Sequence, residues 1–424
     1  MGGGAFLGWR PTNNASLAPK GLALSSRAPV LIVGAGPAGL AIATHLAKAD
    51  VPALVFEAEA RLPRDLRAGS FHPPTMELLH GLGVGAEFLA MGIQVPRWQI
   101  RGRAEGVIVE WDLSLIADET PFPFRLHCEQ FKLTPLLQRR LEALGGTVQF
   151  SHRFLDATQD DAGVVARFET PGGIESVTGR YLIGADGARS AVRHLMGVPF
   201  EGFTWPERFL VIGIEQDLAP YGYTYNAYIA DPVDWGAIFK MPHEGPPGLW
   251  RVLFPTDAAL ADEEVLSHAF AERVLQHFLP RPAPYDIEHT GIYRVHQRVA
   301  AEFRKGRFVI VGDAAHVNNP LGAFGLNGAV QAACNLAEKL ALVCRNEADD
   351  SLIDRYVRQR RAANVAFVQA QSIRNKQILE EKDPAIRAKN LDELRAVAAD
   401  RHRAKDYLIR SSMIWSVRHA ASIE

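Results

Sequence analysis

The sequence has few cysteines, no long apolar run and almost no net charge. Its 424 residues include three cysteines, Cys128, Cys334 and Cys344, without a CxxC pair or a histidine cluster, so we expect neither a disulfide framework nor a metal site. No uninterrupted apolar stretch is long enough to cross a bilayer. A formal net charge of −2, with no basic block among aromatics, argues against nucleic acid and anionic membranes as partners. We therefore expect a reduced, cytoplasmic protein.

The composition is otherwise that of an ordinary globular protein. Hydrophobic residues make up 47% of the chain and charged residues 22%, and the length allows two or three domains. Residues 1–27 are rich in Gly, Ser, Asn and Pro, and no acidic residue precedes Asp50. This segment favours a flexible tail, and an organelle transit peptide is the alternative.

Residues 30–57 predict a strand, a glycine turn, a helix and a second strand. The turn is GAGPAG, and the second strand ends at Glu57. Gly34 permits the tight turn, Gly36 lets the backbone approach a pyrophosphate, and Gly39 lets helix and strand pack closely. The helix N-terminus favours phosphate, and Glu57 can accept hydrogen bonds from a ribose. The stretch predicts a dinucleotide site. Glu57 would repel a 2′-phosphate, so NAD and FAD both remain possible here.

Two later strand ends also carry an aspartate in a glycine turn. Residues 176–183 lead into Asp186 within GADGARS, where the alternative role is simply to cap the next helix. Residues 307–311 lead into Asp313 and a loop rich in small residues that opens a helix ending near residue 344. Ligands of open α/β sheets bind at such strand ends, so both turns are candidate ligand sites.

The remaining segments predict a second domain and a helical C-terminus. Residues 203–254 contain several β-like runs dense in aromatics, which indicates antiparallel strands with an apolar face that either covers a planar ligand or packs as core. Residues 93–125 read as strands and connections without catalytic residues. The last 75 residues are mostly helical and are expected to pack on the core or to carry a subunit contact.

Together, the three glycine motifs resemble the single-component FAD-dependent aromatic hydroxylases, the family of p-hydroxybenzoate hydroxylase and phenol hydroxylase. The second motif is Asp186-Gly187 with Ser190 and Arg193, and the third runs from Gly312-Asp313 to Asn327. The resemblance covers residues 28–345 and implies FAD. It also implies an α/β fold in which an FAD-binding Rossmann-like domain (28–200 and 286–345) holds an inserted antiparallel β-sheet substrate domain (201–285, with help from 70–125), followed by a helical region (346–424).

The resemblance assigns roles to individual residues. Glu57 would hold the adenosine ribose, Asp313 the ribityl chain, and Asp186 both FAD and NAD(P)H. Two residues depart from many relatives, Asn319 where a second proline is common and Thr134 where an acid is common. The full set of expected cofactor-binding residues is Gly34, Gly36, Ala38, Gly39, Glu57, Arg67, Gly69, Gln130, Asp186, Asp313, Pro320, Gly322, Gly325, Leu326 and Asn327.

The implied activity is hydroxylation of an electron-rich aromatic (phenolic, aromatic acid or hydroxypyridine-like) with NADPH or NADH and dioxygen, through a flavin C4a-hydroperoxide. Pro320 would lie against the flavin ring, and Tyr223, Tyr225 and His243 are candidates for deprotonating the substrate. A homodimer is one expected assembly. The alternatives are a halogenase or prenyl reductase on the same scaffold, or a non-enzymatic binder. The WxWxIP segment usual in such halogenases is absent from the sequence, and the retained Glu57, Asp186 and Asp313 argue against a mere binder.

Overall fold

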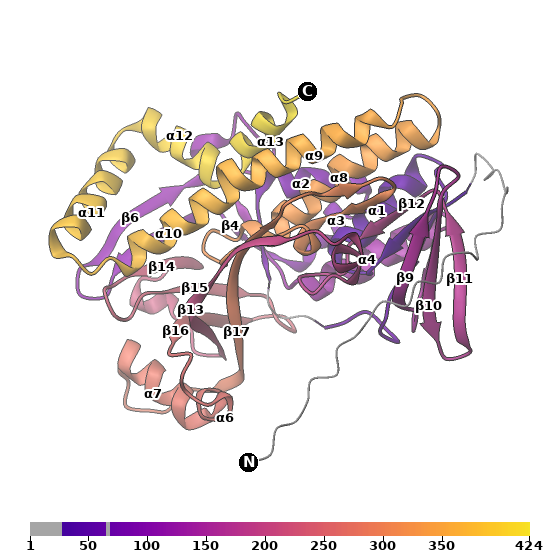
Figure 1. Cartoon of the computed structure of the whole chain (residues 1–424). Coiled ribbons are helices and arrows are strands. Elements are labelled where there is room, and N and C mark those ends of the chain that lie inside the picture. The colour runs from indigo at the N-terminus through magenta and orange to yellow at the C-terminus, as the bar shows by residue number, and fades with distance from the viewer. Residues whose placement is uncertain (1–27, 65–67) are drawn as a thin grey trace, which may run out of the picture.

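The computed structural model describes residues 28–64 and 68–424. The expected N-terminal tail or transit peptide, and the predicted cofactor residue Arg67, lie outside the described residues. Figure 1 shows two sheet-based halves side by side, with the C-terminal helices running along the top of both.

A six-stranded sheet forms the first half, and four of its five neighbouring strand pairs are parallel, the exception being the antiparallel pair of its two strands over residues 304–310. Val33 is paired with both Phe56 and Gly184, and Gly184 with Ile310, so the strands carrying the three motifs end level with one another. The three central strands, over residues 30–33, 181–184 and 308–310, are fully buried, as parallel strands covered on both faces must be. In sheet order the strands are β18 (Arg304–Lys305), β19 (Phe308–Ile310), β12 (Tyr181–Gly184), β1 (Val30–Val33), β2 (Ala53–Phe56) and β8 (Thr147–Gln149).

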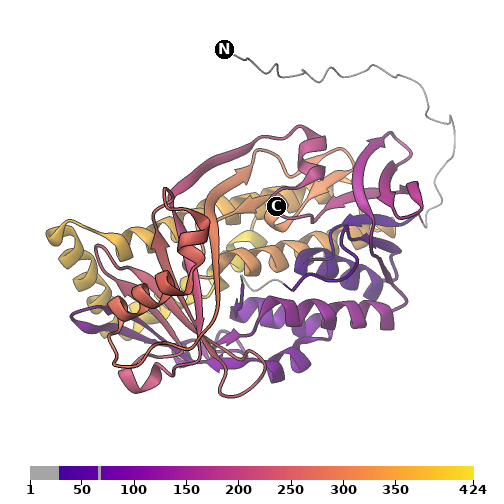
Figure 2. The same cartoon turned by 90° about the horizontal axis from the view of Figure 1, so that it is seen from below.

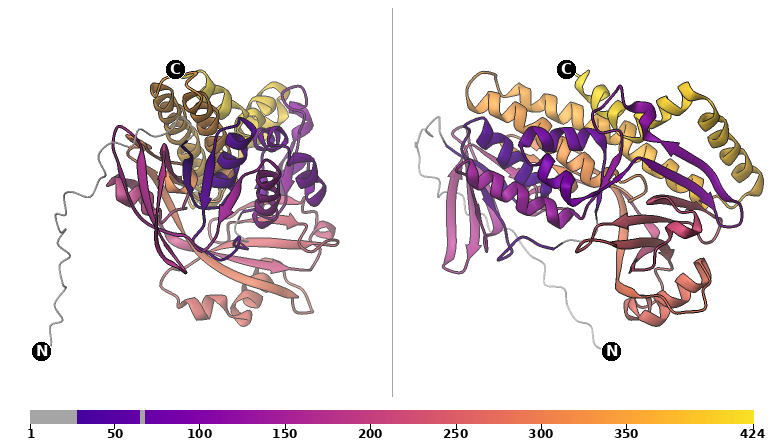
Figure 3. Two further views of the ribbon diagram at one scale, coloured as in Figure 1. Left: turned by 90° about the vertical axis from the view of Figure 1, so that its right-hand side faces the viewer. Right: turned by 180° about the vertical axis from the view of Figure 1, so that it is seen from behind.

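Helices cover one face of this sheet and a small antiparallel sheet covers the other. Helices α1 (Pro37–Lys48), α4 (Gln130–Ala143) and α8 (Phe324–Cys344) pack side by side, as the right-hand view of Figure 3 shows. On the opposite face, Phe168 of the small sheet stacks on Phe56 with ring centroids 4.0 Å apart. The small sheet consists of β9 (Arg153–Gln159), β10 (Val164–Thr170) and β11 (Gly173–Gly179).

An eight-stranded sheet forms the second half. It is antiparallel except for the parallel pair β14–β5. The strand over residues 287–300 pairs with β13 from Phe200↔Ala300 to Ile214↔Ile287, so the chain returns to the first sheet at β18 rather than at the expected boundary of 286. In sheet order the strands are β20 (His316–Val317), β17 (Ile287–Ala300), β13 (Phe200–Ile214), β16 (Leu249–Thr256), β15 (Gly236–Met241), β14 (Asn226–Ala230), β5 (Arg97–Gly102) and β6 (Gly106–Asp112).

Both faces of the large sheet are apolar and covered. One face packs against α6 (Asp262–Leu266) and α7 (His268–Phe278), which lie in front of the sheet in Figure 2. The other face packs against the C-terminal helices α10 (Ala370–Glu380), α11 (Pro384–Ala399) and α12 (Arg401–Ser411). Alternate residues of the central strands therefore belong to two different cores, one under α6 and α7 and one under the C-terminal helices. The core under the C-terminal helices includes Leu321 of the third motif.

The remaining elements connect the two halves. A three-stranded sheet of β3 (Ser70–Phe71), β7 (Arg125–His127) and β4 (Ile93–Val95) lies between them. Helices α9 (Ser351–Ala363) and α13 (Ile414–Ala421) pack on each other, and α9 also packs on α8. The other elements are α2 (Pro73–Leu82), α3 (Gly85–Met91), α5 (Ala191–Met196), the 3-10 helices η1 (Leu113–Ile116), η2 (Ala219–Tyr221) and η3 (Gly312–Ala314), and the π-helix η4 (Asn364–Gln369). Within residues 28–64 and 68–424, every helix is too short or too polar to span a bilayer.

Candidate active site

The first glycine turn has two glycines that are needed for different reasons. Gly34 has φ +102°, and a Cβ there would lie 2.5 Å from the Ala185 carbonyl oxygen, so any side chain would collide with the next strand end. Gly36 has φ −72°, which any residue adopts, and a Cβ there would meet nothing within 4 Å. The space beside Gly36 is therefore open in front of the α1 N-terminus, where an anion is favoured.

Glu57 is fixed at the same turn. Its Oε2 accepts a hydrogen bond from the Ala35 N–H at 2.9 Å, and its Oε1 accepts one from the Glu59 N–H at 3.1 Å. Each carboxylate oxygen keeps a second lone pair for a ligand hydroxyl. The position expected for a ribose-binding acid is thus built by the turn itself.

Asp186 lies just after the end of β12 and supports the start of the next helix. Its carboxylate accepts hydrogen bonds from the Ser190 hydroxyl at 2.6 Å and from the Val192 N–H at 3.2 Å, and Ser190 is the N-cap of α5. The N-cap residue is thus Ser190 and not Asp186, whose carboxylate holds the Ser190 hydroxyl and a second N–H of the first helical turn. Burial raises the pKa of this carboxyl. Asp313 lies exposed in the first turn of η3, one strand further along the same sheet edge.

Arg193 joins the second and third motifs. Its guanidinium is buried, lies 3.9 Å from the Phe200 ring centroid, and donates to the carbonyl oxygens of Ala314 and Ala188 at 2.8 Å each. Gly312 in turn packs toward α1, since a Cβ there would lie 3.4 Å from the Ala38 Cβ. All three motifs therefore meet at one edge of the sheet.

The loop before β3 lies beside the start of α4. The Cys128 N–H donates to the Gly69 carbonyl at 2.8 Å, and the Gln130 N–H donates to the Ala68 carbonyl at 3.0 Å. Two residues predicted to bind the cofactor, Gly69 and Gln130, are thus brought together from segments 61 residues apart.

Asn327 locks the N-terminus of α8 against the same loop. Its side-chain amide donates to the carbonyls of Ser70 at 2.8 Å and Ala323 at 2.7 Å, and its Oδ1 accepts from the His72 N–H at 2.8 Å. The His72 ring bonds the Gly322 carbonyl at 2.8 Å, and burial beside the Arg125 charge lowers the pKa of His72 to about 3. Because both N–H groups of the Asn327 amide donate within the protein, the side chain keeps no free donor for a cofactor.

Asn319, which replaces a proline common in the family, ties the third motif to the C-terminal helices. Its side-chain amide donates to the Ser372 carbonyl at 3.0 Å, and its N–H donates to the Gln297 side chain at 3.1 Å. Pro320, half-buried, follows directly. The loop that holds Pro320 and Gly322 is therefore fixed from both halves of the molecule.

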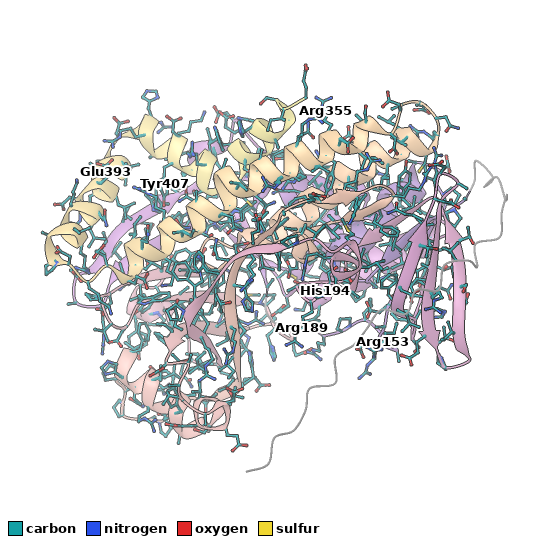
Figure 4. All side chains as sticks on the ribbon, in the orientation of Figure 1. Arg153, Arg189, His194, Arg355, Glu393 and Tyr407 are labelled. Atoms are coloured by element: carbon teal, nitrogen blue, oxygen red, sulfur yellow. The ribbon has the colours of Figure 1, made fainter. Side chains whose placement is uncertain are left out.

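An aromatic cavity opens beside Gly322 on the face of the large sheet that the C-terminal helices cover. The Gly322 N–H donates to the Tyr228 hydroxyl at 3.2 Å, and the Tyr228 ring meets the Trp98 ring edge-on at 5.8 Å. Burial raises the pKa of Tyr407 to about 12. Figure 4 places Tyr407 on α12, beside β6. The lining residues are Trp98, Ile100, Arg125, Tyr228, Gly322, Phe324, Asn375, Ile378, Leu379, Tyr407 and Ser411.

Three residues predicted to act on the substrate lie elsewhere. Tyr223 packs near Phe278 of α7, and the exposed Tyr225 packs edge-on to Trp250, both on the opposite face of the large sheet. His243 lines a separate cavity with Arg64, Met241 and Arg251, and its N–H donates to Glu129 at 2.8 Å. The tyrosines that line the aromatic cavity are Tyr228 and Tyr407.

Sequence reasoning did not single out Tyr228, His72, Arg125 or Tyr407. Period-two alternation along residues 226–230 puts Tyr228 and Tyr225 on opposite faces, but it does not say which face meets the third motif. Arg125 follows a proline-rich connection and Tyr407 sits in a polar helix, so neither has a local pattern that marks a site. Their roles depend on long-range packing.

The arrangement fits FAD. The open approach at Gly36, the fixed carboxylate of Glu57, and the Asp186 and Asp313 turns follow one sheet edge in the order that a dinucleotide needs. The loop at Gly322 and the aromatic cavity lie where that edge meets the large sheet. The chain also matches the family model described as FAD binding domain over residues 27–371.

The chain belongs to this family of FAD-dependent aromatic monooxygenases. It is 35% identical to para-nitrophenol 4-monooxygenase of Pseudomonas sp. (strain WBC-3) over 90% of this chain and 94% of that protein. It is 32% identical to 6-hydroxy-3-succinoylpyridine 3-monooxygenase HspB of Pseudomonas putida (strain DSM 28022 / S16), over 91% and 98%.

Solved structures agree with these sequence relatives. The crystal structure of p-nitrophenol 4-monooxygenase PnpA from Pseudomonas putida DLL-E4 superposes on this monooxygenase with a TM-score of 0.87 at 30% identity, covering 92% of this chain and 98% of that one. The flavin-dependent monooxygenase PieE, in complex with FAD and substrate, gives 0.75 at 26% identity over 92% and 72%. The predicted fold, enzyme class and FAD are confirmed, and these similarities favour a monooxygenase over a non-enzymatic binder.

Proposed function

We propose that this monooxygenase hydroxylates a single-ring phenol or hydroxypyridine bound in the cavity between Tyr228, Trp98 and Gly322. The observation that carries the proposal is the hydrogen bond from the Gly322 N–H to the Tyr228 hydroxyl, which joins the third motif directly to the aromatic wall. Two relatives are named for one hydroxylated ring, a nitrophenol and a hydroxypyridine. The cavity is lined by flat rings and aliphatic side chains that suit such a ligand.

The cofactor would follow the sheet edge. The N–H groups of the first turn of α1, including that of Ala38, would bind the pyrophosphate and Glu57 the ribose, while Asp313 would bind the ribityl chain. Gly34 and Gly39 shape that turn, Asp186 and Gln130 would complete the binding, and Gly69 would flank the ring.

The third motif would hold the flavin ring. The backbone of Pro320, Gly322, Gly325, Leu326 and Asn327 leads into the N-terminus of the 21-residue helix α8, whose positive end stabilises negative charge placed before it. FAD supplies electron uptake from NADPH or NADH and the activation of dioxygen. The protein's own share is to hold the substrate ring beside this loop and to exclude water.

Tyr228 is the side chain placed to handle the substrate hydroxyl. Its oxygen accepts the Gly322 N–H, which leaves its O–H proton for a ligand oxygen. A hydrogen bond of that kind favours the ionised form of a phenol and so enriches the ring in electrons. Tyr223, Tyr225 and His243 have no such position, and we assign them no part in this step.

The test is a substrate screen on the purified holoenzyme. Phenols, 4-nitrophenol, hydroxybenzoates and hydroxypyridines should stimulate NAD(P)H and dioxygen consumption, and mass spectrometry with labelled dioxygen should show one oxygen atom in the product. NAD(P)H oxidation without an oxygenated product would overturn the proposal and favour a reductase. A halogenated product with added halide would favour a halogenase.

The proposal includes three further expectations: NADPH or NADH as the reductant, a homodimer, and a cytoplasmic location. The rates with NADH and with NADPH are compared in the screen. The homodimer is tested by sedimentation of the holoenzyme, and the cytoplasmic location by cell fractionation.

A further inference from the structure

Arg125 is a buried cation in the wall of the aromatic cavity. It lies on β7, its exposed fraction is 2%, and it lines the cavity together with Trp98, Tyr228 and Gly322. A guanidinium remains charged at any physiological pH. The cavity wall therefore carries a permanent positive charge.

The protein supplies little compensation for this charge. Arg125 donates through Nη1 to the Asn226 side-chain oxygen at 2.6 Å, and its guanidinium lies 4.6 Å from the Trp98 ring centroid. Among the residues that the structure describes, its Nε has no hydrogen-bond partner and no carboxylate forms an ion pair with it. The buried Lys376, by contrast, pairs with both Glu207 and Glu380.

The groups around Arg125 are neutral. Burial lowers the pKa of His72 and of His127 to about 3, with the Arg125 charge contributing to both shifts, and raises that of Tyr407 to about 12. The cavity lining contains no Asp or Glu. Two further buried donors, Trp98 Nε1 and Asn226 Nδ2, also have no acceptor among the described residues. The cavity lining thus includes unpaired donors of Arg125 and Trp98 and has no negative charge.

Burying a charge without a counter-charge costs free energy, so we expect such a charge where a ligand supplies the counter-charge. We propose that Arg125 binds an oxyanion on the aromatic substrate, so that the enzyme selects a ring bearing a phenolate or a carboxylate over a neutral one. Asn226 holds the guanidinium in place, and Trp98 supports it from one face. This inference deepens the proposed function and rests on it, since it names the charge of the substrate in the same cavity.

The test compares matched ligands on the holoenzyme. Dissociation constants are measured from the change in flavin absorbance for 4-nitrophenol, 4-hydroxybenzoate and neutral 4-hydroxybenzamide. We expect the anions to bind at least about 30-fold more tightly than the amide, the loss typical of removing one partner of a buried charge pair. Binding of 4-nitrophenol should also tighten as its phenol ionises, because the side chains around Arg125 stay neutral near neutral pH. A preference for only one anion assigns the oxyanion to phenolate or to carboxylate.

Variants separate a binding role from a structural one. Arg125→Met should remove the preference for anions and flatten the pH dependence, and Arg125→Lys should restore part of both. The matched control is Arg97→Met on β5, an exposed arginine paired with Glu110, which should leave all three dissociation constants unchanged. Ligand-free Arg125→Met should unfold at a temperature no lower than wild type.

Each result decides between the roles. A lower unfolding temperature for Arg125→Met together with an unchanged preference for anions would make Arg125 a structural residue and overturn the inference. Wild-type enzyme that hydroxylates the amide as well as the anions would also overturn it while leaving the proposed function intact. Failure of every aromatic ligand to stimulate oxygenation would instead overturn the proposed function.

Discussion

At the scale of single residues, alanine substitutions of Gly34 and Gly36 should have different effects, one on stability and the other on FAD affinity. Gly34→Ala forces a side chain into a left-handed conformation 2.5 Å from the Ala185 carbonyl oxygen and should destabilise the fold by at least about 1–3 kcal/mol. Gly36→Ala has an ordinary φ and open space, so the apoprotein should keep its stability. If the pyrophosphate approaches there, FAD affinity should fall at least about tenfold, or about 1.4 kcal/mol.

The measurements are thermal unfolding of the apoproteins and titration of flavin fluorescence. Gly34→Ala should lower the unfolding temperature, and Gly36→Ala should weaken FAD binding alone. An unchanged FAD affinity in Gly36→Ala would show that the pyrophosphate does not approach the backbone at this turn.

The Asn327 side chain should contribute more to the free energy of unfolding than an ordinary buried amide. Asn327→Ala leaves the buried Ser70 carbonyl and the partly buried Ala323 carbonyl without their side-chain donor, and the buried His72 N–H without its acceptor. At about 1–3 kcal/mol per unsatisfied group, we expect a loss of at least about 3 kcal/mol. Urea denaturation of the holoenzyme measures it. Asn335→Ala, on the same helix with one side-chain donor bond to Gln359, is the control, and an equal cost in both variants would contradict the prediction.

At the scale of elements, α12 closes the aromatic cavity through Tyr407. The Tyr407 ring stacks on the Trp111 ring of β6 with centroids 4.1 Å apart, and its centroid lies 6.2 Å from that of the Trp98 ring. Tyr407→Ala should admit water to the cavity, so that a several-fold smaller share of NAD(P)H oxidation yields hydroxylated product and hydrogen peroxide appears instead. Tyr407→Phe should retain coupling because it keeps the stack.

The check is product formed per NAD(P)H oxidised, with FAD content measured in parallel. Tyr221→Ala, an exposed tyrosine in η2, should match wild type. Normal coupling in Tyr407→Ala would show that α12 is not the water barrier.

The elements also show what the sequence could and could not predict. The glycine turn with Glu57 is a local pattern whose strand, turn and helix follow each other directly, and the structure builds it as predicted. The choice among Tyr223, Tyr225 and Tyr228 depends on which face of β14 meets the Gly322 loop, a long-range fact set by the pairing of β14 with β5. The pairing of β17 with β13 is likewise a long-range fact, since the two strands lie about 90 residues apart in the sequence.

At the scale of the whole molecule, buried histidines should make the fold sensitive to mild acid. Burial lowers the pKa of His72, His127 and His316 from 6.5 to about 3. The unfolded chain binds these protons first, so stability is fully present above about pH 6.5 and falls as the pH drops towards 3. Each histidine contributes a slope of about 1.4 kcal/mol per pH unit, and the three together about 4.

A substitution of His316 tests the contribution of a single histidine to that slope. Neither of its ring nitrogens has a hydrogen-bond partner among the described residues, so His316→Leu loses no bond and should flatten the dependence by about 1.4 kcal/mol per pH unit. Urea unfolding with saturating FAD between about pH 5 and 6.5, above the range where carboxylates protonate, measures it. The exposed His402→Gln should keep the wild-type slope. An unchanged slope in His316→Leu would mean that His316 takes up its proton without unfolding, and that the interior around the third motif admits charge.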